Sequence, residues 1–203
     1  MWYVIQTMTG REQELVDLIT DRQKAVNELI NVGGQSAGDE AYKRTDDSRT
    51  RDRCFVIKRE VVWRRQGECI KHTETLFPGY VFVDTESPQE LYQDLQKIPK
   101  FTKLLGKSEL TDSEELEFVA VSDEEKKFLE ILLDGDPEDT VRLSPVKTVQ
   151  NGEITECGGA LRHYKDLIVK KRIRLRYVIV RMPFLGQKKD ILLGIRLEGD
   201  YRE

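Results

Sequence analysis

Leu76-Phe77-Pro78-Gly79-Tyr80-Val81-Phe82-Val83 is the stretch that decides how this chain folds, because its eight consecutive residues carry no charge in a protein that is 34% charged. Pro78 fixes its own φ angle and lacks an N–H donor, and Gly79 tolerates a positive φ, so the pair predicts a turn or bulge. Tyr80 to Val83 has the composition of a β-strand. Such a run is typical of a sheet core, but aromatic residues at a kinked strand entry also serve partner surfaces.

The size and composition of the chain limit the classes to which it can belong. Its 203 residues suffice for one large domain or two small ones. No apolar stretch approaches the roughly 18–20 residues of a membrane span, and Met1 to Gln6 lacks the basic segment and long apolar core of a signal peptide. The three cysteines are odd in number and form no CxxC pair, which argues against a disulfide framework. We therefore expect a cytoplasmic, monomeric protein without membrane contact.

Charge is distributed unevenly along the chain. Residues 1–140 hold 19 Lys and Arg against 30 Asp and Glu, a net charge of −11, whereas residues 141–203 hold 14 against 7, a net charge of +7. A basic C-terminal part on an acidic body is typical of a protein that contacts nucleic acid through one part only. The alternative is a basic surface that is merely solvated.

The first 133 residues predict an α+β domain. A strand at Met1 to Met8 is followed by a helix with Thr9 and Glu12 as a capping box, which Gly33-Gly34 ends. Residues 33–53 are polar and lack apolar periodicity, which predicts a mobile insert. Further strands are predicted within Cys54 to Arg65, at Cys69 to Thr75 and at Tyr80 to Val83, and further helices after the capping boxes Ser87-Pro88-Gln89-Glu90 and Ser122-Asp123-Glu124-Glu125.

The C-terminal part predicts a different architecture. Residues 134–140 are acidic and contain Gly and Pro, as in a linker. Short strands separated by glycine turns then indicate a small β-barrel over residues 141–203. The predicted strands are Val141 to Val149, Glu153 to Glu156, Leu167 to Lys171, Ile173 to Arg181 and Asp190 to Leu197.

The strongest binding signal in this barrel is a run of alternating basic and apolar residues. If residues 172–179 form one strand, Arg172, Arg174 and Arg176 share its outer face and Ile173, Leu175, Tyr177 and Ile179 share the inner one. Guanidinium groups grip phosphates bidentately and reach base edges, and no acidic residue lies between Leu167 and Arg181. The full set of predicted polyanion-binding residues is Arg162, His163, Lys165, Lys170, Lys171, Arg172, Arg174, Arg176, Lys188 and Lys189.

The order of these segments resembles the NusG family of transcription elongation factors. The matching residues are Trp2-Tyr3-Val4, Gly10-Arg11-Glu12, Phe77-Pro78-Gly79-Tyr80-Val81, Pro99 with Phe101 to Gly106, and Ser122-Asp123-Glu124-Glu125. The resemblance implies an NGN domain, an antiparallel sheet with flanking helices, followed by a KOW β-barrel. Ile168-Val169-Lys170-Lys171-Arg172 and Leu192 to Glu198 look most like the LoaP branch of antiterminators.

The family implies partners for both parts of the chain. The N-terminal domain is expected to dock on the clamp helices of RNA polymerase through Trp2, Tyr3, Phe77, Pro78, Gly79 and Tyr80, with Phe77 exposed. The basic barrel is expected to bind a hairpin in the leader RNA, which would make the protein a specialised antiterminator. The alternative is a general NusG-type elongation factor whose barrel binds a protein. Basic residues of the insert, among them Arg49, Arg51 and Arg53, are candidates for contact with non-template DNA.

Catalysis finds little support in the sequence. His72 and His163 have no metal-ligand spacing, and the chain lacks a phosphate-binding loop, a nucleotide fingerprint and a nucleophile elbow. The three Ser/Thr-x-x-Glu patterns are helix caps rather than acid–base pairs. We therefore expect a protein that is not an enzyme and needs neither metal nor cofactor.

Overall fold

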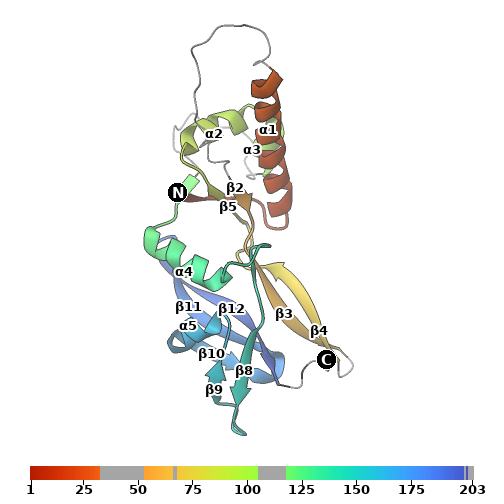
Figure 1. Ribbon diagram of the computed structural model, residues 1–203, viewed down its shortest axis with the longest axis vertical. Helices are drawn as coiled ribbons and strands as arrows, with labels where there is room; N and C mark the ends of the chain where they lie inside the picture. Colours follow the sequence, from red (N-terminus) through yellow and green to blue (C-terminus); the bar gives the residue numbers. More distant parts are fainter. Residues whose placement is uncertain (33–52, 66–67, 105–117, 199, 201–203) are drawn as a thin grey trace. The chain divides into compact units, whose positions relative to one another are not determined.

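The structure is a computed structural model that describes residues 1–32, 53–65, 68–104, 118–198 and 200. It has mixed α+β architecture with several sheets, as the sequence predicts. The chain forms two compact units, one of residues 1–56 and 79–120, the other of residues 57–78 and 121–203 (Figure 1). None of the helices in these described ranges is long and apolar enough to cross a membrane.

The first unit is built on a four-stranded antiparallel sheet with the strand order β2-β5-β1-β6. β1 is central and pairs with β5 from Trp2 opposite Asp84 to Gln6 opposite Tyr80. The strand predicted at Met1 to Met8 is therefore shorter than expected. The strands are β1 (Trp2–Gln6), β2 (Arg53–Phe55), β5 (Tyr80–Asp84) and β6 (Phe118–Ala120).

Three helices accompany this sheet, and the apolar faces of the elements form one core (Figure 1). They are α1 (Glu12–Val32), α2 (Pro88–Gln96) and α3 (Pro99–Leu104). Pro99 ends α2 as predicted, but it also opens α3, because proline is tolerated in the first turn of a helix. The core includes Ile5, Leu15, Ile19, Val81, Val83, Leu95, Phe101 and Phe118.

Two of the three predicted capping boxes are not formed. α1 begins at Glu12 rather than directly after Thr9, and the Glu12 carboxylate accepts a 2.6 Å hydrogen bond from the backbone N–H of Gly79 instead. The Ser87 side chain makes no capping hydrogen bond at the start of α2. The backbone N–H of Ser87 donates instead to the Thr85 hydroxyl at 3.1 Å. At both helix starts another hydrogen bond therefore takes the place of the reciprocal pair that the spacing predicts.

The third capping box is confirmed at the start of α4 (Asp123–Leu133), which belongs to the second unit. The Ser122 hydroxyl accepts from the backbone N–H of Glu125, and the Glu125 carboxylate accepts from the backbone N–H of Ser122. The same carboxylate also accepts a 3.0 Å hydrogen bond from Gly186, so the cap fastens α4 to the strands of this unit.

The second unit contains two sheets, of strand orders β4-β3-β7 and β10-β11-β12-β8-β9. The first consists of the hairpin β3 (Lys58–Arg65) and β4 (Glu68–Thr75), with β7 (Thr140–Val141) parallel to β3. The second consists of β8 (Ser144–Thr148), β9 (Ile154–Cys157), β10 (Ile168–Arg172), β11 (Tyr177–Phe184) and β12 (Gln187–Leu197). A short helix, α5 (Leu161–Tyr164), and two 3-10 turns, η2 (Lys165–Leu167) and η3 (Ile173–Leu175), complete it.

The two sheets of this unit pack closely at one glycine. A Cβ atom on Gly194 of β12 would collide with the backbone carbonyl oxygen of Glu60 and with the Leu143 side chain. Glycine is therefore required where β3 crosses β12, because any side chain would push the two backbones apart. The core of the five-stranded sheet lies among Val178, Val180, Met182, Ile191, Leu193 and Ile195, all buried.

Several sequence predictions about the C-terminal part are corrected by this arrangement. The five-stranded sheet is an open half-barrel, since β9 and β10 are not neighbours in it. The strand predicted at Val141 to Val149 is two strands in different sheets, β7 and β8. Residues 134–140, predicted to be a linker, contain a turn in which Asp136 accepts hydrogen bonds from the backbone N–H groups of Glu138 and Thr140, and the linker itself stays a prediction. The division into domains 1–133 and 141–203 stays a prediction, while the compact units divide the chain differently.

Candidate nucleic-acid interface

Most of the basic residues predicted to bind RNA lie exposed on the second unit. They come from α5, η2, β10, η3 and the start of β12. Two residues of the predicted set differ, because Arg176 is buried and Lys189 is half-buried. The exposed residues are Arg162, His163, Lys165, Lys170, Lys171, Arg172, Arg174 and Lys188.

β10 brings three of these cations together at an edge of the half-barrel. Among the described strands it pairs only with β11, with Lys170 opposite Ile179 and Arg172 opposite Tyr177. The register shifts between Ile168 and Lys170, and Val169 stands at this irregularity with an exposed side chain. Lysines on an edge strand discourage pairing with other strands, and the same charges attract a polyanion.

The predicted arginine row is wrong, because residues 172–179 do not form one strand. β10 ends at Arg172, residues 173–175 form the 3-10 turn η3, and β11 starts at Tyr177. The turn shifts the alternation by one residue, so Val178 and Val180 are fully buried. Leu175, predicted to point inward, is 58% exposed. The alternation of apolar and basic residues could not predict this turn, because the pattern continues through residues 173–175 as it would in a single strand.

Arg176 is buried instead of lying on the outer face. It forms a cluster of hydrogen bonds with Asp200 and Ile173, here called the clasp. Its Nε and Nη2 atoms donate to the two carboxylate oxygens of Asp200, at 2.6 and 2.5 Å. Its Nη1 atom donates to the carbonyl oxygen of Ile173 at 2.7 Å. The Asp200 carboxylate also accepts from the backbone N–H of Leu197. Arg176 therefore connects η3 with the chain that follows β12.

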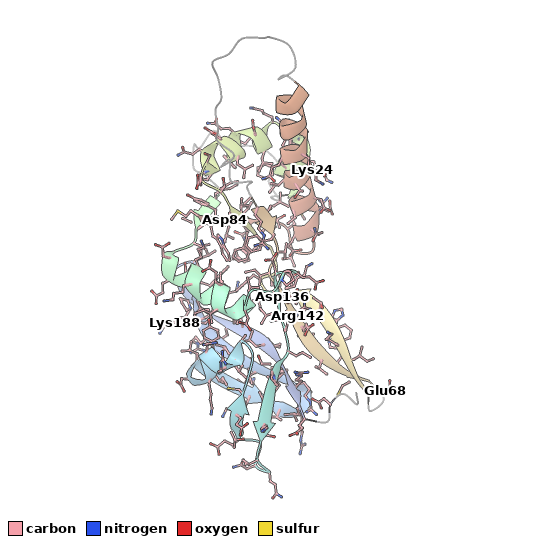
Figure 2. The ribbon with its side chains drawn as sticks, viewed as in Figure 1. Lys24, Glu68, Asp84, Asp136, Arg142 and Lys188 are labelled. Atoms are coloured by element: carbon pink, nitrogen blue, oxygen red, sulfur yellow. The ribbon has the colours of Figure 1, made fainter. Side chains whose placement is uncertain are left out.

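The two lysines at the start of β12, Lys188 and Lys189, do not flank the β10 cations. Lys188 lies opposite Pro183 and Arg172 lies opposite Tyr177, so six residues of β11, roughly 20 Å, separate them. Figure 2 shows Lys188 on the opposite side of this unit from Glu68 at the hairpin end. Lys189 packs its ammonium over Phe184, 5.0 Å from the ring centroid, and burial lowers its pKa.

Phe77, the residue expected to contribute most to polymerase binding, is completely buried. Its ring stacks on Phe184 with centroids 4.3 Å apart and planes at 4°, and Lys189 lies over the same pair. The expectation that Phe77 is exposed is therefore wrong in this structure. Stacked aromatic rings bury a large apolar area. The sequence alone could not show whether the Phe77 ring packs in a core or against a partner.

The other residues predicted to bind polymerase lie in varied environments. Trp2 is buried against Phe55 and Phe82, and its indole N–H donates to Asp84 at 3.1 Å. Tyr3 and Tyr80 are partly buried, and Pro78 is exposed. Gly79 is buried with a φ of 83°, which confirms the predicted turn. Of Trp2 and Tyr3, Tyr3 is thus the more accessible.

A cluster of charged residues that the sequence did not suggest surrounds a cavity of about 460 Å³ in the second unit. The buried Glu60 carboxylate accepts from Lys71, Arg142 and the backbone N–H of Leu143, each at 3.0 Å. Arg142 also pairs with Asp136 and Glu138, and these hydrogen bonds raise its pKa further above its ordinary value. No local pattern could reveal the pair, because Glu60 and Arg142 are 82 residues apart.

This cavity is not a strong anion site, because carboxylates balance its cations. Lys71, Arg142 and Arg196 line it together with Glu60, and Asp136 and Glu138 bind Arg142 beside it. The hydrogen bonds from Leu143, Lys71 and Arg142 outweigh the effect of burial and hold the pKa of Glu60 below its usual range. The network therefore joins β3, β4 and the segment around β7 rather than leaving a free positive surface. Figure 2 shows Arg142 next to Asp136.

Comparisons with known proteins agree with the resemblance noted in the sequence. The family model of NusG, described as transcription termination factor nusG, matches residues 1–129. The transcription termination/antitermination protein NusG of Helicobacter pylori is 27% identical over 111 residues, which cover 53% of this chain and 51% of that protein. The chain thus spans about half the length of this curated relative.

A solved structure, described as domain interaction in Thermotoga maritima NusG, aligns with a TM-score of 0.40 at 18% identity, covering 96% of this chain and 93% of that one. The match to the family model covers more than half of the 203 residues and includes Trp2-Tyr3-Val4 and the Phe77-Pro78-Gly79-Tyr80 corner. The chain belongs to the NusG family.

Proposed function

We propose that this protein is a specialised transcription antiterminator, similar to the LoaP branch, that binds a hairpin in leader RNA through its basic C-terminal residues. The observation that carries the proposal is the cluster of exposed cations on β10 and η3. Lys170, Lys171, Arg172 and Arg174 stand there without an acidic residue between Leu167 and Arg181 in the chain. Phosphate contacts of this kind supply most of the affinity for nucleic acid.

The N-terminal part would carry this activity to the clamp helices of RNA polymerase. Trp2 and Phe77 are buried, so the accessible members of the predicted surface are Tyr3, Pro78 and Tyr80. Tyrosine is favoured at interfaces because it buries a large area with few rotatable bonds. Docking would therefore use the exposed side of the corner, or would require Phe184 to move away from Phe77.

The RNA part of the proposal is tested by removing the β10 cations from the full chain. We expect the triple variant Lys170→Ala, Lys171→Ala and Arg172→Ala to bind leader hairpin RNA more weakly and with a log–log salt slope smaller by roughly 2, at about 0.7–0.9 per lost phosphate contact. Arg181→Ala is the matched control, because Arg181 is exposed but paired with Asp190 at 2.6 Å. Equal binding by the triple variant, or equal binding of RNA and matched DNA, would contradict the proposal.

A specific observation also favours the alternative, a general elongation factor with a protein partner. Leu167, Val169 and Leu175 are 40, 47 and 58% exposed on the same segments as the cations. Protein interfaces need exposed apolar area more than a cluster of positive charge. If Leu167→Ser and Val169→Ser abolish binding of a protein captured on the wild-type chain while RNA binding is weak and flat in salt, this alternative replaces the first.

A further inference from the structure

We infer that the turn η3, here called the tip, contacts the RNA directly. Arg174 binds a phosphate and Leu175 packs against an unpaired base. Arg176 and Asp200 hold the tip in position. The inference rests on the proposed function and specifies its ligand as RNA with unpaired nucleotides. It starts from the observation that the turn exposes an apolar side chain and buries a charged one. Leu175 is 58% exposed, whereas Arg176, the next residue, is buried.

The clasp fixes the turn through contacts at both of its ends. The Ile173 carbonyl oxygen accepts from the backbone N–H of Arg176 at 3.1 Å and from its Nη1 atom at 2.7 Å. Arg176 has a φ of 58°, a left-handed conformation that costs a non-glycine residue energy. The backbone N–H of Ile195 donates to the Arg176 carbonyl oxygen at 2.9 Å, which ties the turn to β12.

Arg176 is a positioning residue because its donors are occupied within the protein. Nε and both Nη atoms donate to Asp200 or Ile173, and the side chains of Arg176 and Asp200 are only 10 and 5% exposed. A bidentate, desolvated ion pair has defined geometry, so it holds the turn in one conformation. A tip ordered in advance loses little conformational entropy when it binds.

The exposed residues of the turn suit unpaired nucleotides better than a regular duplex. Arg174 extends the cation cluster of β10 by one turn, and it can bind a phosphate of any RNA. An apolar side chain can pack against a base only where the base is unstacked, as in loops and bulges, because stacked bases in an A-form stem cover their own faces. Leu175 beside Arg174 therefore predicts preference for a loop or bulge.

Two RNA probes test the ligand class with the full chain. One is a stem with an apical loop of unpaired nucleotides, and the other is the same stem as two annealed strands without a loop. We expect Leu175→Ser to weaken binding of the looped RNA about fivefold to tenfold, from the lost burial of a partly exposed leucine, and to leave the duplex unchanged. Arg174→Ala should weaken both and reduce the salt slope by about 0.7–0.9.

A double-mutant cycle tests the positioning role. With the duplex probe, to which Leu175 does not contribute, Arg176→Ala should lower affinity and salt slope as Arg174→Ala does. The double variant should lose no more than either single one, because Arg176 acts through Arg174. If Arg176→Ala unfolds, Asp200→Asn is used instead, because it removes the charge of the ion pair and keeps the shape of the side chain. Arg181→Ala, at an exposed residue that is paired with Asp190 at 2.6 Å, is the control and should leave the preference for the looped RNA unchanged.

The outcomes separate this inference from the proposed function. If the wild type binds neither RNA, the proposed function fails. If it binds both RNAs and Leu175→Ser affects them equally or not at all, the inference about the tip fails while the proposed function survives. If the losses of Arg174→Ala and Arg176→Ala add, Arg176 contacts RNA itself and is not a positioning residue.

Discussion

The corner at Phe77-Pro78-Gly79 and the turn at Arg174-Leu175-Arg176 share a feature of the backbone conformation. They differ in whether the buried side chain is apolar or charged. Each contains a residue with positive φ, 83° at Gly79 and 58° at Arg176. The corner buries its aromatic residue completely, as hydrophobicity requires. The turn buries an arginine and exposes a leucine, against the same rule.

This difference separates a structural feature from a candidate functional one. The corner uses glycine where the backbone needs a left-handed residue, so nothing in it conflicts with stability. The turn uses arginine there and requires Asp200 as a compensating partner. Sequences that break a local rule and compensate for it elsewhere tend to do so at functional sites. The comparison therefore points to Leu175 and Arg174 rather than to Phe77.

The largest effect on stability is expected at the corner. Phe77→Ala should lower the free energy of unfolding by about 3–5 kcal/mol, because it leaves a cavity against Phe184 in a packed core. Urea unfolding followed by circular dichroism measures the change. Pro78→Ala, at an exposed neighbour, should cost less than about 1 kcal/mol. A small effect of Phe77→Ala would mean that the ring is not part of a core in solution.

Breaking the clasp in the turn should have the next largest effect. Arg176→Ala should cost about 3 kcal/mol, because it leaves the buried Asp200 carboxylate without its partner. Arg176→Gly should cost about 1 kcal/mol less, since glycine adopts the positive φ without strain. Thermal and urea unfolding of both variants provide the test. If Ala and Gly are equivalent, the left-handed conformation does not contribute to the difference between the two turns.

A smaller effect is expected from a methyl group at the corner. Gly79→Ala should cost about 1–2 kcal/mol from its positive φ. Contacts of 3.2 Å with the Thr7 carbonyl oxygen and 3.3 Å with the Thr9 hydroxyl should add to this cost. Gly186→Ala is the matched control, because Gly186 has a φ of 71° but open space around its Cβ position. Equal losses in the two variants would show that backbone strain alone accounts for the corner.

The smallest expected effect is a dependence on pH at the corner. Burial by itself would raise the pKa of Glu12, but backbone N–H groups of Gly79, Glu12 and Gly10 outweigh it, so the pKa lies below its ordinary value. Glu12 therefore contributes stability above its unfolded pKa of about 4.3, and this contribution is lost as the pH falls through the lower folded value.

Glu12→Gln, which keeps an acceptor oxygen for Gly79 but no titrating proton, should make the free energy of unfolding less sensitive to acid. Unfolding measured at neutral pH and near pH 3 compares the variant with the wild type. An unchanged loss on acidification would show that the Gly79 hydrogen bond does not depend on the charge of Glu12.

Local signals predicted many of the elements. The hairpin of β3 and β4, the strand β5 after the corner, the helix α4 and its capping box all lie where the sequence placed them. These elements depend on neighbours within a few residues, so the information is present in the sequence pattern. The exposed cations of β10 could also be predicted, because charged side chains on an edge strand remain in water.

The composition of the candidate interface could not be predicted in full, for reasons visible at single residues. The burial of Phe77 depends on Phe184, more than a hundred positions away, and that of Arg176 on Asp200 beyond β12. The turn η3 keeps basic and apolar residues alternating as a strand would. Periodicity therefore could not show that Leu175 points outward and that Val178 points inward.

By itself, the sequence determined the mixed α+β class, the family motif at Phe77-Pro78-Gly79-Tyr80 and the basic character of residues 141–203, because each depends on residue type and short-range spacing. Only the tertiary structure decided which of those residues face solvent. Burial is set by partners brought together from distant parts of the chain, and a stacked ring or a desolvated ion pair can hide a residue that its type alone assigns to the surface.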